Sequence, residues 1–402
     1  MRVLVTGARM WYAINTIRLL AEGGHEVFAA DSNKLSGGLY SRHLKGKFIY
    51  PSVSENGEAF VRFVMEKIEE MEIDVLCPTF EEGFVFSKHS DLLQGRVKMI
   101  VPSYQHIRLL HDKFSMTNYA KSLGISVPRT TLLENFEPTS SIFPVVIKPR
   151  NLRSAEGVSK VNSQDEFIKC SKDLDGDKYL VQEWKHPYQI CTSGLAYNGQ
   201  LIGNVIYHNL REYPESGGIG TCRISIECEE VLSNVKKIVS DLNYSGFISM
   251  DFLHDRNSNA YYLVDVNPRM SPGLLVAYTS GVDMVSAYID LVIKNKVVRL
   301  SPLETGNGTY TTAMEIGWFF STLFKGKFGN LKGFFRSRKK LKDDSWDVRD
   351  PAPFFVMLVS MLYTAIFGPL KGGQTKSFSL GATSDIESLD EEENFNEKRQ
   401  VV

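Results

Sequence analysis

Residues 246–269 read GFISMDFLHDRNSNAYYLVDVNPR, and the fold assignment starts from this stretch. Gly246–Leu253 and Ala260–Val266 are apolar runs typical of β-strands, and a short polar segment separates them. The pattern predicts two antiparallel strands joined by a turn. In such a pair we expect Asp251 and Asp265 to face each other across the ladder.

Two facing carboxylates suggest a cation site. Their mutual repulsion is relieved by Mg²⁺, a hard ion that prefers oxygen ligands. Asn267 lies two residues beyond Asp265, so an extended chain places both side chains on one face. Asp251, Asp265 and Asn267 therefore form a plausible three-point magnesium site. Arg269, two residues further, could stabilise charge on a transferring phosphoryl group.

Three other segments carry groups suited to phosphate or nucleotide binding. Lys148 ends the apolar strand Phe143–Lys148, and the loop Arg150–Gly157 follows it. Backbone N–H groups of such a loop can cover an anion, although the sequence contains no P-loop. Asp112-Lys113 is expected inside a helix, and Gln182-Glu183-Trp184 at the end of a strand. Each segment alone is more often an ordinary solvent-exposed surface, so the functional interpretation depends on the order of these segments along the chain.

Together these segments resemble the ATP-grasp superfamily, in the branch that includes carbamoyl-phosphate synthetase, biotin carboxylase and amino-acid ligases. The matching motifs are His111-Asp112-Lys113, Ile147-Lys148-Pro149, Gln182-Glu183-Trp184, and Asp251 with Asp265-Val266-Asn267-Pro268-Arg269. The resemblance covers residues 1–300. Two departures concern the metal site, because the family usually has glutamate in place of Asp265 and often in place of Asp251.

The resemblance implies a role for each matching residue. Lys113 and Lys148 would contact ATP phosphates, with Ser154 and Gly157 in the covering loop. The adenine hinge would consist of Gln182, Glu183, Trp184 and Lys185, and Glu183 or Gln189 would reach the ribose.

The resemblance also assigns the metal ligands and the arginines. Asp251, Asp265 and Asn267 would bind two Mg²⁺ ions, which Mn²⁺ can replace. Arg269, and less securely Arg223, would stabilise the transferred phosphoryl group.

The reaction implied is that of an ADP-forming carboxylate–amine ligase. A substrate carboxylate would be phosphorylated by Mg·ATP, and an amine would then displace phosphate to give an amide. One alternative is an ATP-grasp enzyme that uses bicarbonate, of carbamoyl-phosphate-synthetase or carboxylase type. Another is a protein that binds ATP without turnover. The sequence does not identify the carboxylate or the amine.

The N-terminal part alternates strands and helices from Arg2 to Pro78, which predicts a parallel, Rossmann-like sheet. The turn at Gly7 lacks the further glycines of a dinucleotide-binding fingerprint, so NAD binding is not expected. The fold class is therefore α/β followed by α+β. We expect four parts: a Rossmann-like pre-ATP-grasp domain (1–100), an ATP-grasp domain (101–300), a C-terminal extension with basic and apolar helices (301–380) and a disordered acidic tail (381–402).

Composition limits the partners and the compartment. The 402 residues carry 46 basic and 47 acidic side chains, so no global field attracts nucleic acid. The five cysteines form no CxxC pair, and the N-terminus shows no signal-peptide pattern. These features predict a cytoplasmic location without nucleic-acid binding, and the small-molecule substrates are those that the resemblance implies.

The sequence does not determine what the C-terminal extension contacts. Phe319–Lys342 mixes phenylalanines with eight basic residues, and Pro351–Leu370 has no charge. The uncharged stretch could pack on the enzyme, form a homodimer, or attach to a membrane surface. Its prolines leave too short a helix for a simple span.

Overall fold

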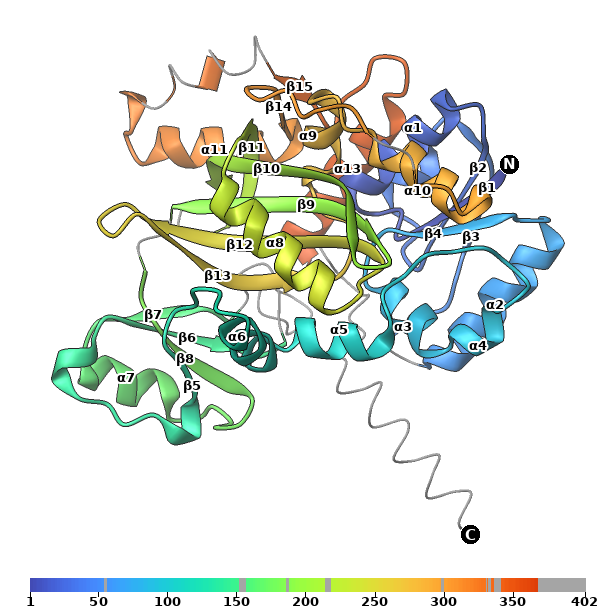
Figure 1. Ribbon diagram of the computed structural model, residues 1–402. Coiled ribbons are helices and arrows are strands. Elements are labelled where there is room, and N and C mark those ends of the chain that lie inside the picture. Colours follow the sequence, from blue (N-terminus) through green and yellow to red (C-terminus); the bar gives the residue numbers. More distant parts are fainter. Residues whose placement is uncertain are drawn as a thin grey trace.

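The computed structural model describes residues 1–53, 56–151, 157–185, 188–213, 218–297, 300–329, 331, 334–335 and 341–367. The predicted acidic tail and Ser154 lie outside these residues. Figure 1 shows three sheets: a parallel one at one end, a small one at the other, and a large antiparallel one between them. All five cysteines are free thiols.

The N-terminal sheet is parallel, with strand order β3-β2-β1-β4. Its elements are β1 (Arg2–Thr6), α1 (Trp11–Glu22), β2 (Glu26–Asp31), η1 (Gly37–Tyr40), β3 (Leu44–Ile49), α2 (Gly57–Glu70), β4 (Val75–Pro78), α3 (Glu82–Lys88) and α4 (Ser90–Leu93). Strands β1 and β4 are buried on both faces, which explains their unbroken apolar sequence. The strand–helix alternation predicted for this part is confirmed.

Two helices lead from this sheet to the rest of the molecule, α5 (Tyr104–His111) and α6 (Lys113–Ser122). The sequence predicted one helix through this region, and that prediction is wrong. Asp112 leaves the helical conformation, and its carboxylate accepts a hydrogen bond from the Ser115 backbone N–H at 2.6 Å. An aspartate that caps a new helix in this way ends the preceding one, so Lys113 stands at the first position of α6.

The small sheet has strand order β5-β8-β6-β7 and a core of its own, which includes Val145, Ile147, Val161, Phe167 and Val181. Its elements are β5 (Thr130–Leu132), η2 (Leu133–Asn135), η3 (Ser140–Ile142), β6 (Val145–Pro149), β7 (Ser159–Val161), α7 (Gln164–Ser171) and β8 (Tyr179–Glu183). This core is separate from the cores of the large sheet.

The large sheet has strand order β13-β12-β9-β10-β11-β14-β15 and is antiparallel except for its last pair. Its elements are β9 (Gln189–Tyr197), β10 (Gln200–Tyr213), β11 (Ile219–Ile226), α8 (Glu229–Asp241), β12 (Gly246–Asp255), β13 (Ala260–Asn267), α9 (Gly273–Thr279), α10 (Met284–Lys294), β14 (Gly308–Tyr310) and β15 (Lys342–Asp343). Helix α8 packs with α6 on one face, and α9 and α10 join the core shared with α1 on the other.

The C-terminal helices are α11 (Thr312–Phe324) and α13 (Ala352–Phe367). Phe354 and Met357 of α13 belong to the core shared with α1, so the uncharged stretch packs on the enzyme through one face. Arg18 of α1 binds Asp350 at 3.0 Å and thereby fixes the segment before α13. In the described part of the chain, no single helix combines the length and apolar character needed to cross a membrane; α9 and α10 would do so only as a pair bent by 98°.

Candidate active site

The two aspartates predicted to face each other are directly paired in the sheet. Asp251 of β12 lies opposite Asp265 of β13 in the antiparallel register. The next pair is Phe252 with Leu263, so Val264 is the extra residue of a β-bulge. A bulge leaves a backbone group outside the ladder. The carbonyl of Val264 is used in this way, because Lys148 Nζ donates to it at 3.4 Å.

Asn267 and Arg269 continue the site along the same face. Asn267 Nδ2 donates to Asp265 Oδ2 at 3.3 Å, and Arg269 Nη2 donates to Asn267 Oδ1 at 3.0 Å. Arg269 also lies over the ring of Phe80, 4.8 Å from its centroid, and 3.9 Å from Glu81 Oε1. The strand spacing predicted that Asp265, Asn267 and Arg269 share one face. The contacts with Phe80 and Glu81 connect Arg269 to the N-terminal part of the protein.

Both predicted lysines reach this cluster from other elements. Lys113, at the start of α6, places Nζ 3.6 Å from Asp265 Oδ1. Lys148 comes from β6 of the small sheet and is only 7% exposed. The cap residue Asp112 binds Arg150 Nε at 2.7 Å, and Lys113 N donates to the Arg150 carbonyl. Residues from three separate segments of the chain therefore meet at Asp265.

The charges in this cluster change one another's protonation. Burial and the neighbouring Asp265 raise the pKa of Asp251 to about 7. Burial alone would raise the pKa of Asp265, but Lys113 and Lys148 hold it below its usual value. Burial and the charge of Lys113 lower the pKa of Lys148 to about 8. Shifts of opposite sign within one cluster are typical of functional sites.

The predicted hinge residues lie at the end of β8, where the small sheet meets the large one. Glu183 binds Lys185 Nζ at 2.8 Å and lies 3.5 Å from Arg129 Nε. Trp184 lies under Lys160 Nζ, 4.2 Å from the ring centroid. Gln182 does not point into a hinge: its Nε2 donates to Thr130 Oγ1 within the small sheet.

Two further residues predicted to contact the nucleotide are Gln189 and Gly157. On β9, the side chain of Gln189 accepts a hydrogen bond from Asn209 Nδ2 at 3.2 Å. Gly157, just after the undescribed residues of the covering loop, has φ of +70°, and a Cβ there would lie 3.1 Å from Pro149 Cγ. Glycine is therefore required at this turn for conformation and for space.

Arg223 is not brought into the cluster at Asp265. Its side chain is 1% exposed, and Nη1 binds Asp344 Oδ2 at 2.8 Å and donates to Thr311 Oγ1 at 3.3 Å. The guanidinium also donates to the carbonyl of Gly220. These partners belong to β11 and to the C-terminal segment, so the geometry indicates a structural ion pair in place of the phosphate contact that was predicted.

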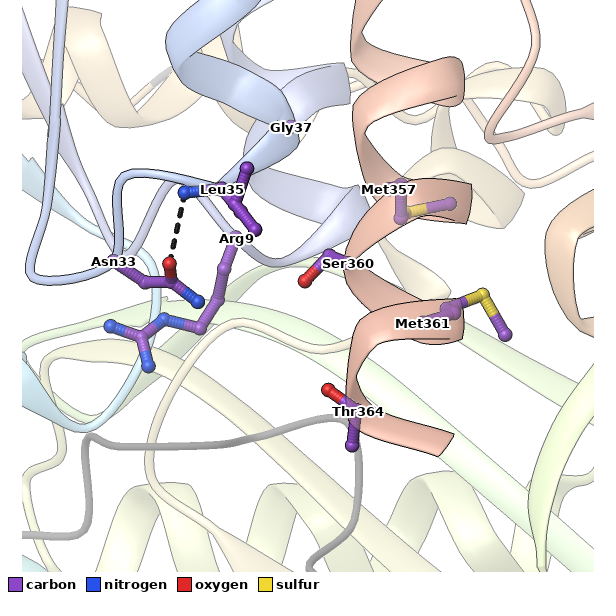
Figure 2. Close-up of a pocket in the computed structure, with 8 residues that line it drawn as sticks. All are labelled: Arg9, Asn33, Leu35, Gly37, Met357, Ser360, Met361 and Thr364. Carbon is purple, nitrogen blue, oxygen red and sulfur yellow. Dashed lines mark hydrogen bonds between the residues drawn. The ribbon is translucent and has the colours of Figure 1, made fainter. Parts of the chain in front are cut away.

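A pocket lies apart from this cluster, between the N-terminal part and α13, and Figure 2 shows the side chains around it. Its lining residues are Arg9, Asn33, Leu35, Gly37, Met357, Ser360, Met361 and Thr364. No predicted site residue is among them. Arg9 forms an ion pair with Asp31, which compensates the charge of its guanidinium.

The cluster also contains two groups to which the sequence assigned no role. His111 is buried next to Lys113, and burial and that lysine lower its pKa to about 4, so it is neutral at pH 7. Glu81 is 1% exposed and faces Arg269. In the sequence, His111 belongs to the motif His111-Asp112-Lys113, and Glu81 follows shortly after the end of a strand. Many residues with a purely structural role occupy such positions. Within the described ranges, no group of three or more His, Cys, Asp or Glu side chains could hold a metal; the predicted set has two carboxylates and one amide.

Comparison with known proteins agrees with this geometry. The model of an ATP-grasp domain matches residues 110–273. The carbamoyl phosphate synthase large chain of Thermoanaerobacter pseudethanolicus is 24% identical over 226 residues, which is 52% of this chain and 21% of the synthase. The coenzyme gamma-F420-2:alpha-L-glutamate ligase of Methanococcus maripaludis is 25% identical over 204 residues, 46% of this chain and 67% of the ligase. The chain thus corresponds to about a fifth of the synthase's length.

Solved structures share the fold. The biotin carboxylase domain of Hydrogenobacter thermophilus 2-oxoglutarate carboxylase, crystallised with MgADP, ADP and bicarbonate, superposes with a TM-score of 0.60 at 16% identity. That match covers 76% of this chain and 73% of the other. The residues gathered around Asp265, from Lys113 to Arg269, all lie within the matched family region. The chain therefore carries an ATP-grasp domain over residues 110–273 and is homologous to ATP-grasp enzymes.

Proposed function

We propose that this protein is an ADP-forming ligase that joins a carboxylate to an amine through an acyl phosphate. One observation carries the proposal: Lys113, Lys148, Asp251, Asp265 and Arg269, distant in sequence, form one cluster. The cluster combines cations for phosphate oxygens with carboxylates for a divalent ion. Phosphoryl transfer needs such positioning and charge neutralisation.

The donor set fits a magnesium ion. Asp251 and Asp265 face each other half-buried, and burial together with the neighbouring carboxylate of Asp265 raises the pKa of Asp251. A bound divalent ion would relieve the repulsion between the two carboxylates, and Asn267 could add an amide oxygen. Mg²⁺, when bound here, would hold phosphate oxygens and neutralise their charge. We propose two such ions by resemblance, with Mn²⁺ able to replace them.

The protein's own residues would position the substrates. Lys148 and Lys113 would bind phosphate oxygens of ATP, and the segment Glu183–Lys185 would receive the adenine. The substrate carboxylate would attack the γ-phosphorus as the bond to ADP breaks. Arg269, fixed by Asn267, would stabilise the phosphorylated carboxylate until the amine attacks its carbonyl carbon and phosphate leaves. No covalent bond to the protein is formed.

The small sheet would act as the cover of this site. It carries Lys148, which already contacts the Val264 carbonyl beside Asp265, and it has its own core, so the sheet would hold a phosphate-binding cation over Asp265 and exclude water. Water exclusion matters because an acyl phosphate hydrolyses readily. We also propose that the N-terminal parallel sheet is a pre-ATP-grasp domain within residues 1–100, and that residues 101–300 form the catalytic domain.

A second candidate function uses bicarbonate as the carboxylate. It is favoured by two of the comparisons, with a carbamoyl phosphate synthase large chain and with a biotin carboxylase domain bound to bicarbonate. Both reactions place the same demands on the cluster at Asp265. The choice therefore depends on the substrate.

The testing experiment measures ADP release from Mg·ATP with amino acids singly and in pairs, and with bicarbonate. Release that requires one carboxylate and one amine, with an amide product found by mass spectrometry, is the expected result. Release that requires only bicarbonate would support the second function. Tight ATP binding without release under any condition would contradict both ligase reactions, and absence of ATP binding would contradict the assignment of the site.

A further inference from the structure

Helix α11 and the residues that follow it expose several phenylalanine side chains. Among the described residues, all five exposed phenylalanines lie between residues 320 and 355. Three of them, Phe320, Phe324 and Phe328, are 49%, 85% and 63% exposed. Phe320 and Phe324 lie one turn apart on α11, with ring centroids 6.4 Å apart, and so share one face of the helix. Phe328 follows after α11 has ended and the chain has turned at Gly326, whose φ is +69°. Single exposed apolar residues need no explanation, but several close together mark an interaction surface.

The same segment has aromatic residues that point inward and hold it in place. Trp318 and Phe334 are 4% and 6% exposed, and their rings stack at 5.9 Å. Arg211 lies over both rings and forms a buried ion pair with Glu315 of α11 at 2.7 Å. The inner face of α11 is therefore anchored to the large sheet. The outward phenylalanines are consequently presented by a fixed support and cannot simply fold into the core.

The charge of this segment is one-sided. Residues 316–342 contain eight lysines and arginines and no aspartate or glutamate, although the whole chain has 46 basic and 47 acidic residues. Lys325 and Lys327 are exposed and lie between Phe324 and Phe328 in the sequence. We call these four residues together with Phe320 the basic aromatic surface. It combines side chains that enter a lipid interface with cations that bind anionic headgroups.

We propose that the basic aromatic surface docks the enzyme on a membrane leaflet that contains anionic phospholipid. Charge complementarity favours this occupant over a second copy of the chain, because two copies of this surface would oppose like charges. Phenylalanine rings without polar edges suit the acyl boundary of a bilayer. In Figure 1 the large sheet lies between α11 and the small sheet, so docking through α11 leaves the covering sheet free to move. The proposal does not depend on the identity of the reaction.

The experiment is vesicle flotation with the full chain. We expect binding to vesicles of phosphatidylcholine with phosphatidylserine, loss of binding at high salt, and little binding to phosphatidylcholine alone. The double variants Phe324→Ser/Phe328→Ser and Lys325→Gln/Lys327→Gln should each weaken binding by about tenfold or more. The first pair is exposed, so the thermal unfolding midpoint should not change.

Matched controls separate this surface from general charge and hydrophobicity. Lys236→Gln/Lys237→Gln removes two exposed cations from α8, and Ile168→Ser removes an exposed apolar side chain from α7. Neither should change vesicle binding. Equal losses in the controls would overturn the proposal, as would equal binding to neutral vesicles.

Two other outcomes identify a different occupant and would also overturn the proposal. If light scattering shows a dimer that Phe324→Ser/Phe328→Ser converts to a monomer, and vesicles do not bind, the surface joins two copies. If single-stranded RNA binds and vesicles do not, the cations serve a nucleic acid. ATP hydrolysis or ligation by the variants plays no part in these outcomes.

Discussion

Two sets of buried or half-buried charges in this protein differ in how closely their members approach. At Asp265, Lys113 lies 3.6 Å away, and Arg269 lies 3.9 Å from Glu81. The pair of Arg223 and Asp344, by contrast, is closed at 2.8 Å and is at most 1% exposed. The comparison separates a structural ion pair in direct contact from a site where cations and carboxylates stand near one another with longer contacts.

The difference has a thermodynamic meaning. A closed buried pair stabilises the fold only while both partners are present. Both sets carry a cost of burial: burial raises the pKa of Asp344 to about 7, and burial together with the neighbouring Asp265 raises the pKa of Asp251 to about 7. A ligand that carries complementary charges would recover this cost at Asp265, where the contacts between the charged groups are longer. The Arg223–Asp344 pair should therefore matter mainly for stability, and the cluster at Asp265 mainly for activity.

The largest expected effect concerns Asp265. The substitution Asp265→Asn should lower the rate of ATP-dependent product formation on the order of a thousandfold, because a carboxylate that serves the metal and both lysines is lost. Because Lys113 and Lys148 hold the pKa of Asp265 below its usual value, the free energy of unfolding should also fall, but the loss of activity should dominate. Steady-state ADP release and urea denaturation measure the two quantities. Asp165→Asn, an exposed acid on α7, is the control; an equally active Asp265→Asn would remove Asp265 from the site.

The next effect should appear in stability. Arg223→Met leaves Asp344 buried without its cation, and breaking such a pair costs about 3 kcal/mol of unfolding free energy. ATP affinity should change little if Arg223 is structural. The control is Arg96→Met, which removes an exposed pair with Glu69 worth at most about 1 kcal/mol. A stable Arg223→Met protein that has lost activity would reverse the comparison and return Arg223 to the phosphate site.

A pH dependence should follow from Lys148. Its lowered pKa of about 8 means that the free protein loses this cation as pH rises through 8, whereas an ordinary lysine stays charged. ATP affinity should therefore fall by about tenfold between pH 7 and pH 9. Lys148→Arg keeps its charge over this range, so its affinity should be flat. Calorimetric titration with ATP at several pH values tests this, and an identical fall in both proteins would exclude Lys148 as the cause.

The smallest effect is expected at Glu81. Its carboxylate lies 3.9 Å from Arg269, so Glu81→Gln should loosen the arginine and reduce kcat about fivefold, with little change in KM for ATP. Glu81→Asp should recover part of the rate if charge is what matters. A change confined to KM would show that Glu81 contributes to nucleotide binding and not to the position of Arg269.

The sequence predicted best where a short-range rule applies. The alternation of β13 and the polar turn before it were enough to place Asp251 opposite Asp265, and the spacing of two placed Asn267 and Arg269 with them. The approach of Lys113 and Lys148 was expected only from the family resemblance. No local pattern relates α6 and β6 to β13, because their meeting depends on how separate sheets pack.

Where the prediction failed, a distant partner or a local cap was responsible. Asp112 ends α5 because its side chain caps the next helix, a signal that the apolar periodicity of the region conceals. Arg223 follows a glycine-rich turn and looks like a phosphate contact, yet its partner Asp344 is 121 residues away. Sequence spacing does not reveal a pairing of this range. The bulge at Val264, which provides the carbonyl for Lys148, was likewise not foreseen.

The segment that contains Asp344 and Asp350 also has a consequence for synthesis on the ribosome. Asn15 and Arg18 of α1 find their partners in this segment, with Asn15 donating to the Asp344 carbonyl at 2.9 Å and Arg18 binding Asp350. At about 5–20 residues per second, the ribosome needs roughly a quarter of a minute to one minute to reach that segment after α1. During this interval Asn15 and Arg18 are without the partners that the late segment provides, so we expect the docking of residues 344–350 onto α1 to be among the last steps of folding.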